Sequence, residues 1–82
     1  MSKLVHIYVV DHEGEGIYGI PVKLYQCPKH ITDKHGKVTI SIATPDVTIY
    51  INGFTGYDGA TRNLENTLYF NNLGEMLSGW SR

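Results

Sequence analysis

The sequence predicts an all-β fold: a small seven-strand antiparallel Greek-key β-sandwich with a short C-terminal tail or helical turn. Three observations predict it. Apolar and polar residues alternate with a period of two through most of the 82 residues, as in strands with one buried face. Turn-forming residues recur about every 6–10 positions. No apolar stripe of helical period is long enough for a major helix. We expect a single domain over residues 1–82, with its core in about 4–70 and a tail in 71–82.

The first half of the chain contains four predicted strands. Leu4–Val10 alternates in the β pattern and runs into an acidic turn with several glycines; Ile20–Gln26 restarts the alternation. A short strand at His30–Thr32 is followed by a turn and by Lys37–Ile42, the clearest strand of all. Gly36 supplies the positive φ that a tight hairpin between these two strands needs.

The second half begins with a proline turn and a fifth strand over Val47–Asn52. The glycines in Gly53–Gly59 predict an aromatic loop there, and a final apolar strand is expected near Asn66–Phe70. Within 71–82, four apolar residues have helical spacing, which favours one or two helical turns: Leu73, Met76, Leu77 and Trp80.

One face of each predicted strand is apolar, and these faces should form the core between two sheets. Fully burying each such side chain contributes about 1.5–3 kcal/mol before chain entropy is subtracted. The predicted core residues are Val5, Ile7, Val9, Val22, Leu24, Val38, Ile40, Ile42, Val47, Ile49 and Ile51.

The composition excludes several classes of protein. With 41% apolar and 18% charged residues and a net charge of −1, the chain is neither a disordered tail nor a strongly basic nucleic-acid binder. No apolar run approaches the roughly 20 residues that span a bilayer, so we expect no membrane partner. Cys27 is the only cysteine, which favours a reducing compartment or a self-sufficient β core. The first residues lack a signal-peptide pattern, which predicts a cytoplasmic protein unless a leader has been removed.

The order of short motifs resembles that of a known family. Val10-Asp11 is followed by Gly19–Leu24, then Thr32–Val38, Val47–Ile51 and Gly56-Tyr57. This order resembles the V-x-D, G-x-P-V-x-L, T-D-x-x-G, Y-x-I and G-Y pattern of the carboxypeptidase regulatory-like group of transthyretin-like (prealbumin-like) β-sandwich domains. The resemblance covers about residues 4–70. It implies an accessory module of the kind appended to peptidases, embedded in surface proteins, or used in adhesion and assembly.

We therefore expect a non-catalytic binding or structural module, of a kind that can also form part of a larger assembly. Its partner would be another protein, a second copy of the chain, or a carbohydrate. Exposed aromatic residues commonly anchor such contacts. The candidate contact residues are Phe54 and Tyr57 in the expected loop, the outward-facing Tyr25 and Tyr50, and Met76, Leu77 and Trp80 in the tail. The resemblance also implies a second interpretation of Tyr57, as a plug at one end of the sandwich.

A catalytic alternative is a transthyretin-like hydroxyisourate hydrolase. Tyr8 stands where that group has a histidine three residues before Asp11, and the chain ends in Ser78–Arg82 rather than in that group's Tyr-Arg-Gly-Ser segment. No Gly-x-Ser-x-Gly elbow for a nucleophile occurs either. The expectation is that the chain is not an enzyme and needs no cofactor.

Two charged clusters have both an ordinary and a functional interpretation. Asp11, Glu13 and Glu15 match the opening of a calcium loop, but Val22 occupies the twelfth position, where a glutamate should stand. The basic segment 29–37 is either a solvated turn or a weak anion-binding patch. Weak zinc candidates, for which exposed hairpin side chains are the ordinary interpretation, are Cys27, His30 and His35.

Overall fold

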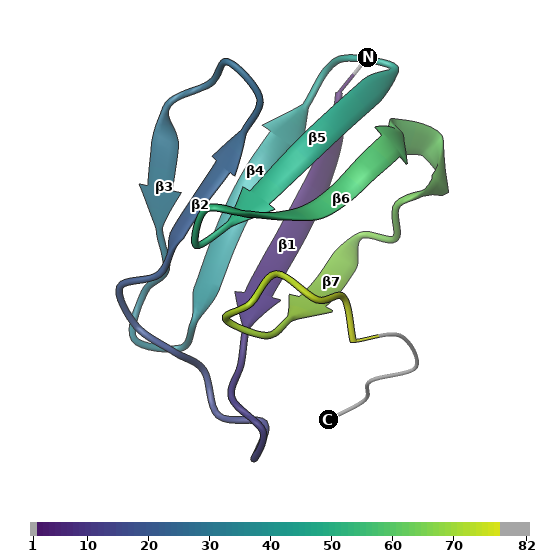
Figure 1. The fold of residues 1–82 in the computed structure, drawn as a ribbon. Helices are drawn as coiled ribbons and strands as arrows, with labels where there is room; N and C mark the ends of the chain where they lie inside the picture. The colour runs from purple at the N-terminus through teal and green to yellow at the C-terminus, as the bar shows by residue number, and fades with distance from the viewer. Residues whose placement is uncertain (1, 78–82) are drawn as a thin grey trace.

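In the computed structural model, which describes residues 2–77, seven strands form two sheets that lie one over the other (Figure 1). One sheet has the order β4-β1-β7 and the other β3-β2-β5-β6. The strands are β1 (Lys3–Val9), β2 (Pro21–Leu24), β3 (Lys29–Ile31), β4 (Lys37–Ile42), β5 (Asp46–Ile51), β6 (Phe54–Ala60) and β7 (Thr67–Phe70), with a 3₁₀ turn η1 (Thr61–Asn63) before β7. The all-β prediction with two sheets is confirmed. Within the described residues, no helix could cross a membrane.

The prediction of a wholly antiparallel fold is wrong for β7, which pairs with β1 in parallel. The reason is the connection from β6, which belongs to the other sheet. Through η1 the chain crosses over to the end of the molecule where β1 begins, so β7 must run in the same direction as β1. Backbone and side-chain bonds fix this arrival: the His6 N–H donates to the Asn66 carbonyl at 2.7 Å, and the Lys3 ammonium donates to the Leu64 carbonyl.

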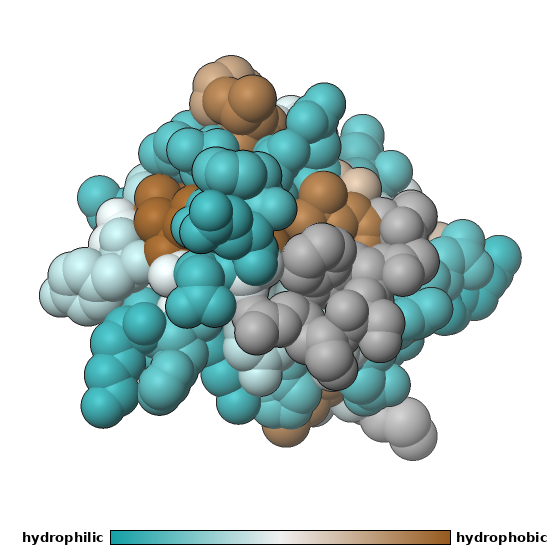
Figure 2. Space-filling view, turned by 90° about the horizontal axis from the view of Figure 1, so that it is seen from below, coloured by the Kyte–Doolittle hydropathy of each residue, from teal (hydrophilic) through white to brown (hydrophobic). Residues whose placement is uncertain are grey.

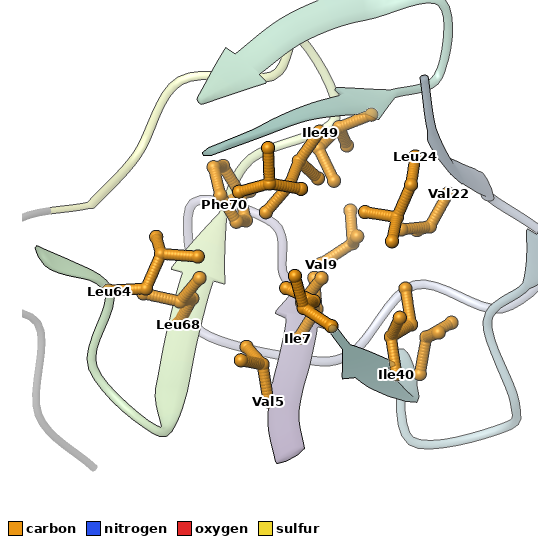
Figure 3. Close-up of a cluster of buried hydrophobic side chains, with 14 residues drawn as sticks. Val5, Ile7, Val9, Val22, Leu24, Ile40, Ile49, Leu64, Leu68 and Phe70 are labelled. Atoms are coloured by element: carbon orange, nitrogen blue, oxygen red, sulfur yellow. The ribbon is translucent and has the colours of Figure 1, made fainter. Parts of the chain in front are cut away.

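The core lies between the two sheets and contains every residue that the alternation predicted for it. Figure 3 shows these side chains pointing into the shared interior from both sheets. Four further buried apolar residues were not in the predicted core set: Val10, Leu64, Leu68 and Phe70. Because the inward faces are β-branched and closely spaced, most of the hydrophobic stabilisation comes from this layer.

The segment Gly53–Gly59, predicted as a loop, is in fact mostly strand β6. It forms a hairpin with β5 through Asn52-Gly53, whose φ angles of 51° and 84° are those of a type I′ turn. Gly56 falls at the register shift opposite Ile49 and Tyr50, so it acts as the extra residue of a bulge. The Phe70 ring occupies the space where a Cβ of residue 56 would stand, 2.9 Å from that position.

Three turns of the molecule share one local design, an Asx residue followed three positions later by glycine with positive φ. In each, the Asx Oδ1 accepts bonds from two backbone N–H groups of the same turn, at 2.8–3.0 Å. The turns are Asp11–Glu15, Asp33–Lys37 and Asn71–Glu75. Because β1 and β7 end where β4 begins, all three lie at the same end of the sandwich. Seen from this end, the described surface is mostly hydrophilic, with small separate hydrophobic patches (Figure 2).

Thr32, the last residue of the predicted strand at His30–Thr32, lies just after β3 and bonds to the segment before β2. Its buried hydroxyl accepts a bond from the Ile20 N–H at 2.8 Å and donates one to the Ile17 carbonyl at 2.7 Å. The hydroxyl therefore fixes the segment before β2 against the end of β3, while Asp33 alone closes the turn.

The described part of the tail is not helical. After the Asn71–Glu75 turn the chain folds back along β7, with an antiparallel bridge between Phe70 and Met76 and a bond from the Leu77 N–H to the Tyr69 carbonyl at 2.9 Å. Gly74 has a φ of 82°, a conformation that ends a helical pattern but suits this turn. The helical prediction is therefore wrong for residues 71–77, and its remainder lies outside the described residues.

Candidate functional site

An open groove of about 540 Å³ runs over the outer face of the four-stranded sheet. Its volume is within the range of small-ligand pockets. Strands β2, β3 and β5 and the turns after β2 and β5 supply its walls. The lining residues are Pro21, Lys23, Tyr25, Gln26, Lys29, Tyr50 and Gly53.

The alternation of the strands explains why these side chains meet. Tyr50 lies between the buried Ile49 and Ile51, and Lys23 lies between buried neighbours in β2, so both must point outward. Strand pairing then places Lys23 directly beside Tyr50 on one side and beside Lys29 on the other. The N–H of Tyr25 donates to the Thr48 carbonyl at 3.0 Å, which keeps this residue in the ladder and its 60% exposed side chain at the groove. Two of the predicted contact residues, Tyr25 and Tyr50, are thus brought together.

The groove is positively charged. Both lysines are exposed, they are register partners on adjacent strands, and the lining has no acidic residue. Within residues 2–77 neither Lys23 nor Lys29 takes part in an ion pair. Like charges directly opposite on a sheet destabilise it. This pair of lysines was not predicted, because the sequence shows a basic cluster but not which strands pair.

Gln26 forms one edge of the groove in an unusual backbone conformation. Its φ of 60° is in the left-handed region, which non-glycine residues seldom adopt and which costs them about 1–2 kcal/mol. The turn is closed by a bond from the Cys27 N–H to the Leu24 carbonyl at 3.0 Å. The turn thus carries a strained residue at the position where a side-chain amide borders the groove.

The other two aromatic candidates lie elsewhere. Tyr57 is the register partner of the buried Ile49, so its ring faces inward, packs against the core, and donates its hydroxyl proton to the Ala60 carbonyl at 2.7 Å. This matches the interpretation of Tyr57 as a structural plug. Phe54, 48% exposed, lies against the third Asx turn, where a Cβ on Gly74 would stand 2.8 Å from the Phe54 Cβ. The four aromatic residues therefore do not form one platform.

The tail candidates are also separate from the groove. Met76 is exposed beside the end of β7, and Leu77 is half-buried, where it borders a second depression with Val10 and Ile17. Trp80 lies outside the described residues.

No metal site assembles from the candidates. Within the described chain, no group of three or more His, Cys, Asp or Glu side chains is placed to hold an ion. His30 lies in β3, whereas His35 lies in the Asp33–Lys37 turn that leads into β4. The Asp11 carboxylate serves its own turn: the N–H groups of Glu15 and Glu13 lower the pKa of Asp11. In the same way, the N–H groups of Lys37 and His35 lower the pKa of Asp33.

A second aromatic cluster, on the outer face of the three-stranded sheet, was not predicted as a candidate. Tyr8 of β1 stacks on Tyr69 of β7 with ring centroids 5.1 Å apart, and the Lys37 ammonium lies 5.9 Å from the Tyr8 centroid. The alternation around Tyr8 could have indicated its outward position, but only the parallel register of β7 brings Tyr69 beside it.

Comparisons of this chain with protein-family models, with curated proteins and with solved structures found no match.

Proposed function

We propose that the chain is a non-catalytic binding module whose contact surface is the groove that contains Tyr25 and Tyr50. The observation that carries the proposal is the pairing of two outward tyrosines with two lysines on one sheet face. Tyrosine offers a rigid apolar ring and a polar hydroxyl, a combination frequent at binding surfaces. The groove lining has no carboxylate, histidine, serine or cysteine that would act as acid, base or nucleophile.

We also propose, from the motif order, that the module belongs among transthyretin-like Greek-key sandwiches of the carboxypeptidase regulatory-like kind. Accessory domains of this group function through contacts with other molecules. The partner classes that this proposal includes are another protein, a second copy of the chain, and carbohydrate.

The test is binding of the purified chain to an array of defined peptides and of neutral and acidic glycans. Three proteins are compared: the wild type, the double variant Tyr25→Ala/Tyr50→Ala, and the control Tyr18→Ala, which removes a 73% exposed tyrosine outside the groove. We expect the wild type and the control to bind the same array features and the double variant to lose them. Binding that survives in the double variant, or no binding to any feature, would contradict the proposal. So would catalytic turnover of hydroxyisourate in a spectrophotometric assay.

A further inference from the structure

The strongest unexplained feature of the groove is its uncompensated charge. Lys23 and Lys29 face each other across β2 and β3, and the chain as a whole has a net charge of −1. Here no acid borders the groove, so both ammonium groups are available to an anionic group that would also relieve their repulsion.

The other groups of the groove fit a ring-shaped polar ligand. Tyr25 and Tyr50 supply aromatic surface, which favours contact with the C–H faces of sugar rings. The Gln26 amide has two donor hydrogens and an acceptor oxygen, which suit neighbouring hydroxyl groups. Glycine would adopt the positive φ of this position at a lower conformational free energy, but it would leave no side chain at the groove.

An extended peptide fits this surface less well. A peptide strand gains affinity by adding its main-chain bonds to a sheet edge. The groove lies on the face of the sheet, between strands whose backbone groups already bond to one another. Recognition on this face must come from side chains alone, which favours a ligand with its own charged and hydroxyl groups on each unit.

Resting on the proposed function, we propose that the groove binds acidic carbohydrate: sugar rings that carry carboxylates, held by Lys23 and Lys29, with ring faces against Tyr25 and Tyr50. The contact is an ion-paired, non-covalent one, and it weakens as salt screens the exposed charges.

The experiment is an NMR titration of the full ¹⁵N-labelled chain with three kinds of hexamer. These are galacturonate and mannuronate hexamers, the fully methyl-esterified galacturonate hexamer as the uncharged match, and hexaglutamate as an acidic peptide. We expect at least one acidic sugar to shift the signals of the groove residues, with the ester binding at least about fivefold more weakly. Raising the salt from about 50 to 200 mM should weaken the acidic sugar further.

Two lysine variants and one control test the assignment of the charge. Lys23→Gln and Lys29→Gln should each weaken binding of the acidic hexamer about two- to fivefold, as for exposed ion pairs. Lys34→Gln, which removes an exposed lysine in the second Asx turn, should not change it.

Several results would overturn the inference. They are equal binding of the ester and the acid, tighter binding of hexaglutamate than of either sugar, and no shift with either acidic sugar. None of them by itself refutes the binding module, which is tested separately by the dependence of array binding on the two tyrosines. Conversely, array binding that is unchanged in the double tyrosine variant would refute the proposed binding module, even if an acidic sugar bound elsewhere on the chain.

Discussion

Replacing threonine by valine should destabilise the protein at one buried position and should not destabilise it at another. Thr32 is 1% exposed and its hydroxyl makes two hydrogen bonds, to the Ile20 N–H and the Ile17 carbonyl. Thr61 is 7% exposed, and within the described residues its hydroxyl has no partner. The two substitutions remove the same atom and add the same methyl group, so they differ only in the bonds that are lost.

The expected magnitudes follow from the bonds. Thr32→Val leaves one N–H and one carbonyl without their partner, and each such group costs about 1–3 kcal/mol when buried. Since both backbone groups belong to half-buried residues, we expect the lower part of the summed range, a loss of about 2–4 kcal/mol. For a domain of this size that corresponds to a melting temperature lower by roughly 10–25 °C. Thr61→Val removes an unpaired hydroxyl and should leave stability unchanged or raise it by about 1–2 kcal/mol.

The assay is urea unfolding at 25 °C followed by far-ultraviolet circular dichroism, with the slope m compared between variants. An unchanged m with a lower midpoint for Thr32→Val is the expected result. Two results would refute this prediction: a free energy of unfolding of Thr32→Val within about 0.5 kcal/mol of the wild-type value, or an equal loss of stability in the two variants.

Three further predictions use the same unfolding assay. Lys29→Glu should raise the free energy of unfolding by about 0.2–1 kcal/mol, since it turns a like-charge pair with Lys23 into an opposite-charge pair; a loss of stability would show that the repulsion is absent. Gly16→Ala should lower the free energy of unfolding by about 2–3 kcal/mol, because the new Cβ would overlap a backbone carbonyl of the neighbouring turn. The loss should be larger than for the control Gly19→Ala, where the space is open and only the φ of 82° opposes alanine. Because the pKa of Asp33 is lowered in the folded state, its ionised carboxylate stabilises the fold at pH values above the ordinary pKa of 3.8, and this stabilisation is lost as the pH falls below that value. Asp33→Asn should therefore flatten the pH dependence of the free energy of unfolding below about pH 4. An acid profile equal to that of the wild type would contradict this.

The core was predictable because it depends on a local signal. Val5, Ile7 and Val9 are buried on one side of β1, as the alternation required, and the same holds for the other strands that were predicted to supply the core, β2, β4 and β5. The exception is β6, whose glycines resemble those of a loop. Gly56 is there because a bulge and the Phe70 ring need the space, which is a contact between distant parts of the chain. The Asn52-Gly53 pair did carry a hairpin signal that could have corrected the prediction.

The site was predictable only in part, for a related reason. Outward tyrosines at positions 25 and 50 follow from alternation, but their shared groove requires the β2–β5 register. Lys23 and Lys29 became neighbours through strand pairing, which no local pattern encodes. The inward position of Tyr57, which distinguishes its two interpretations, depends on the bulge before it, and no local pattern predicts that bulge. The direction of β7 likewise depends on a crossover between sheets.

The most direct test of the central claim is a map of backbone amide shifts over both sheets on adding each of the two acidic hexamers, galacturonate and mannuronate. The account predicts that the largest shifts lie on the outer face of β3, β2 and β5, around Lys29, Lys23 and Tyr50, and that they shrink in Lys23→Gln. Shifts centred on the opposite sheet, around the stacked Tyr8 and Tyr69, would contradict it.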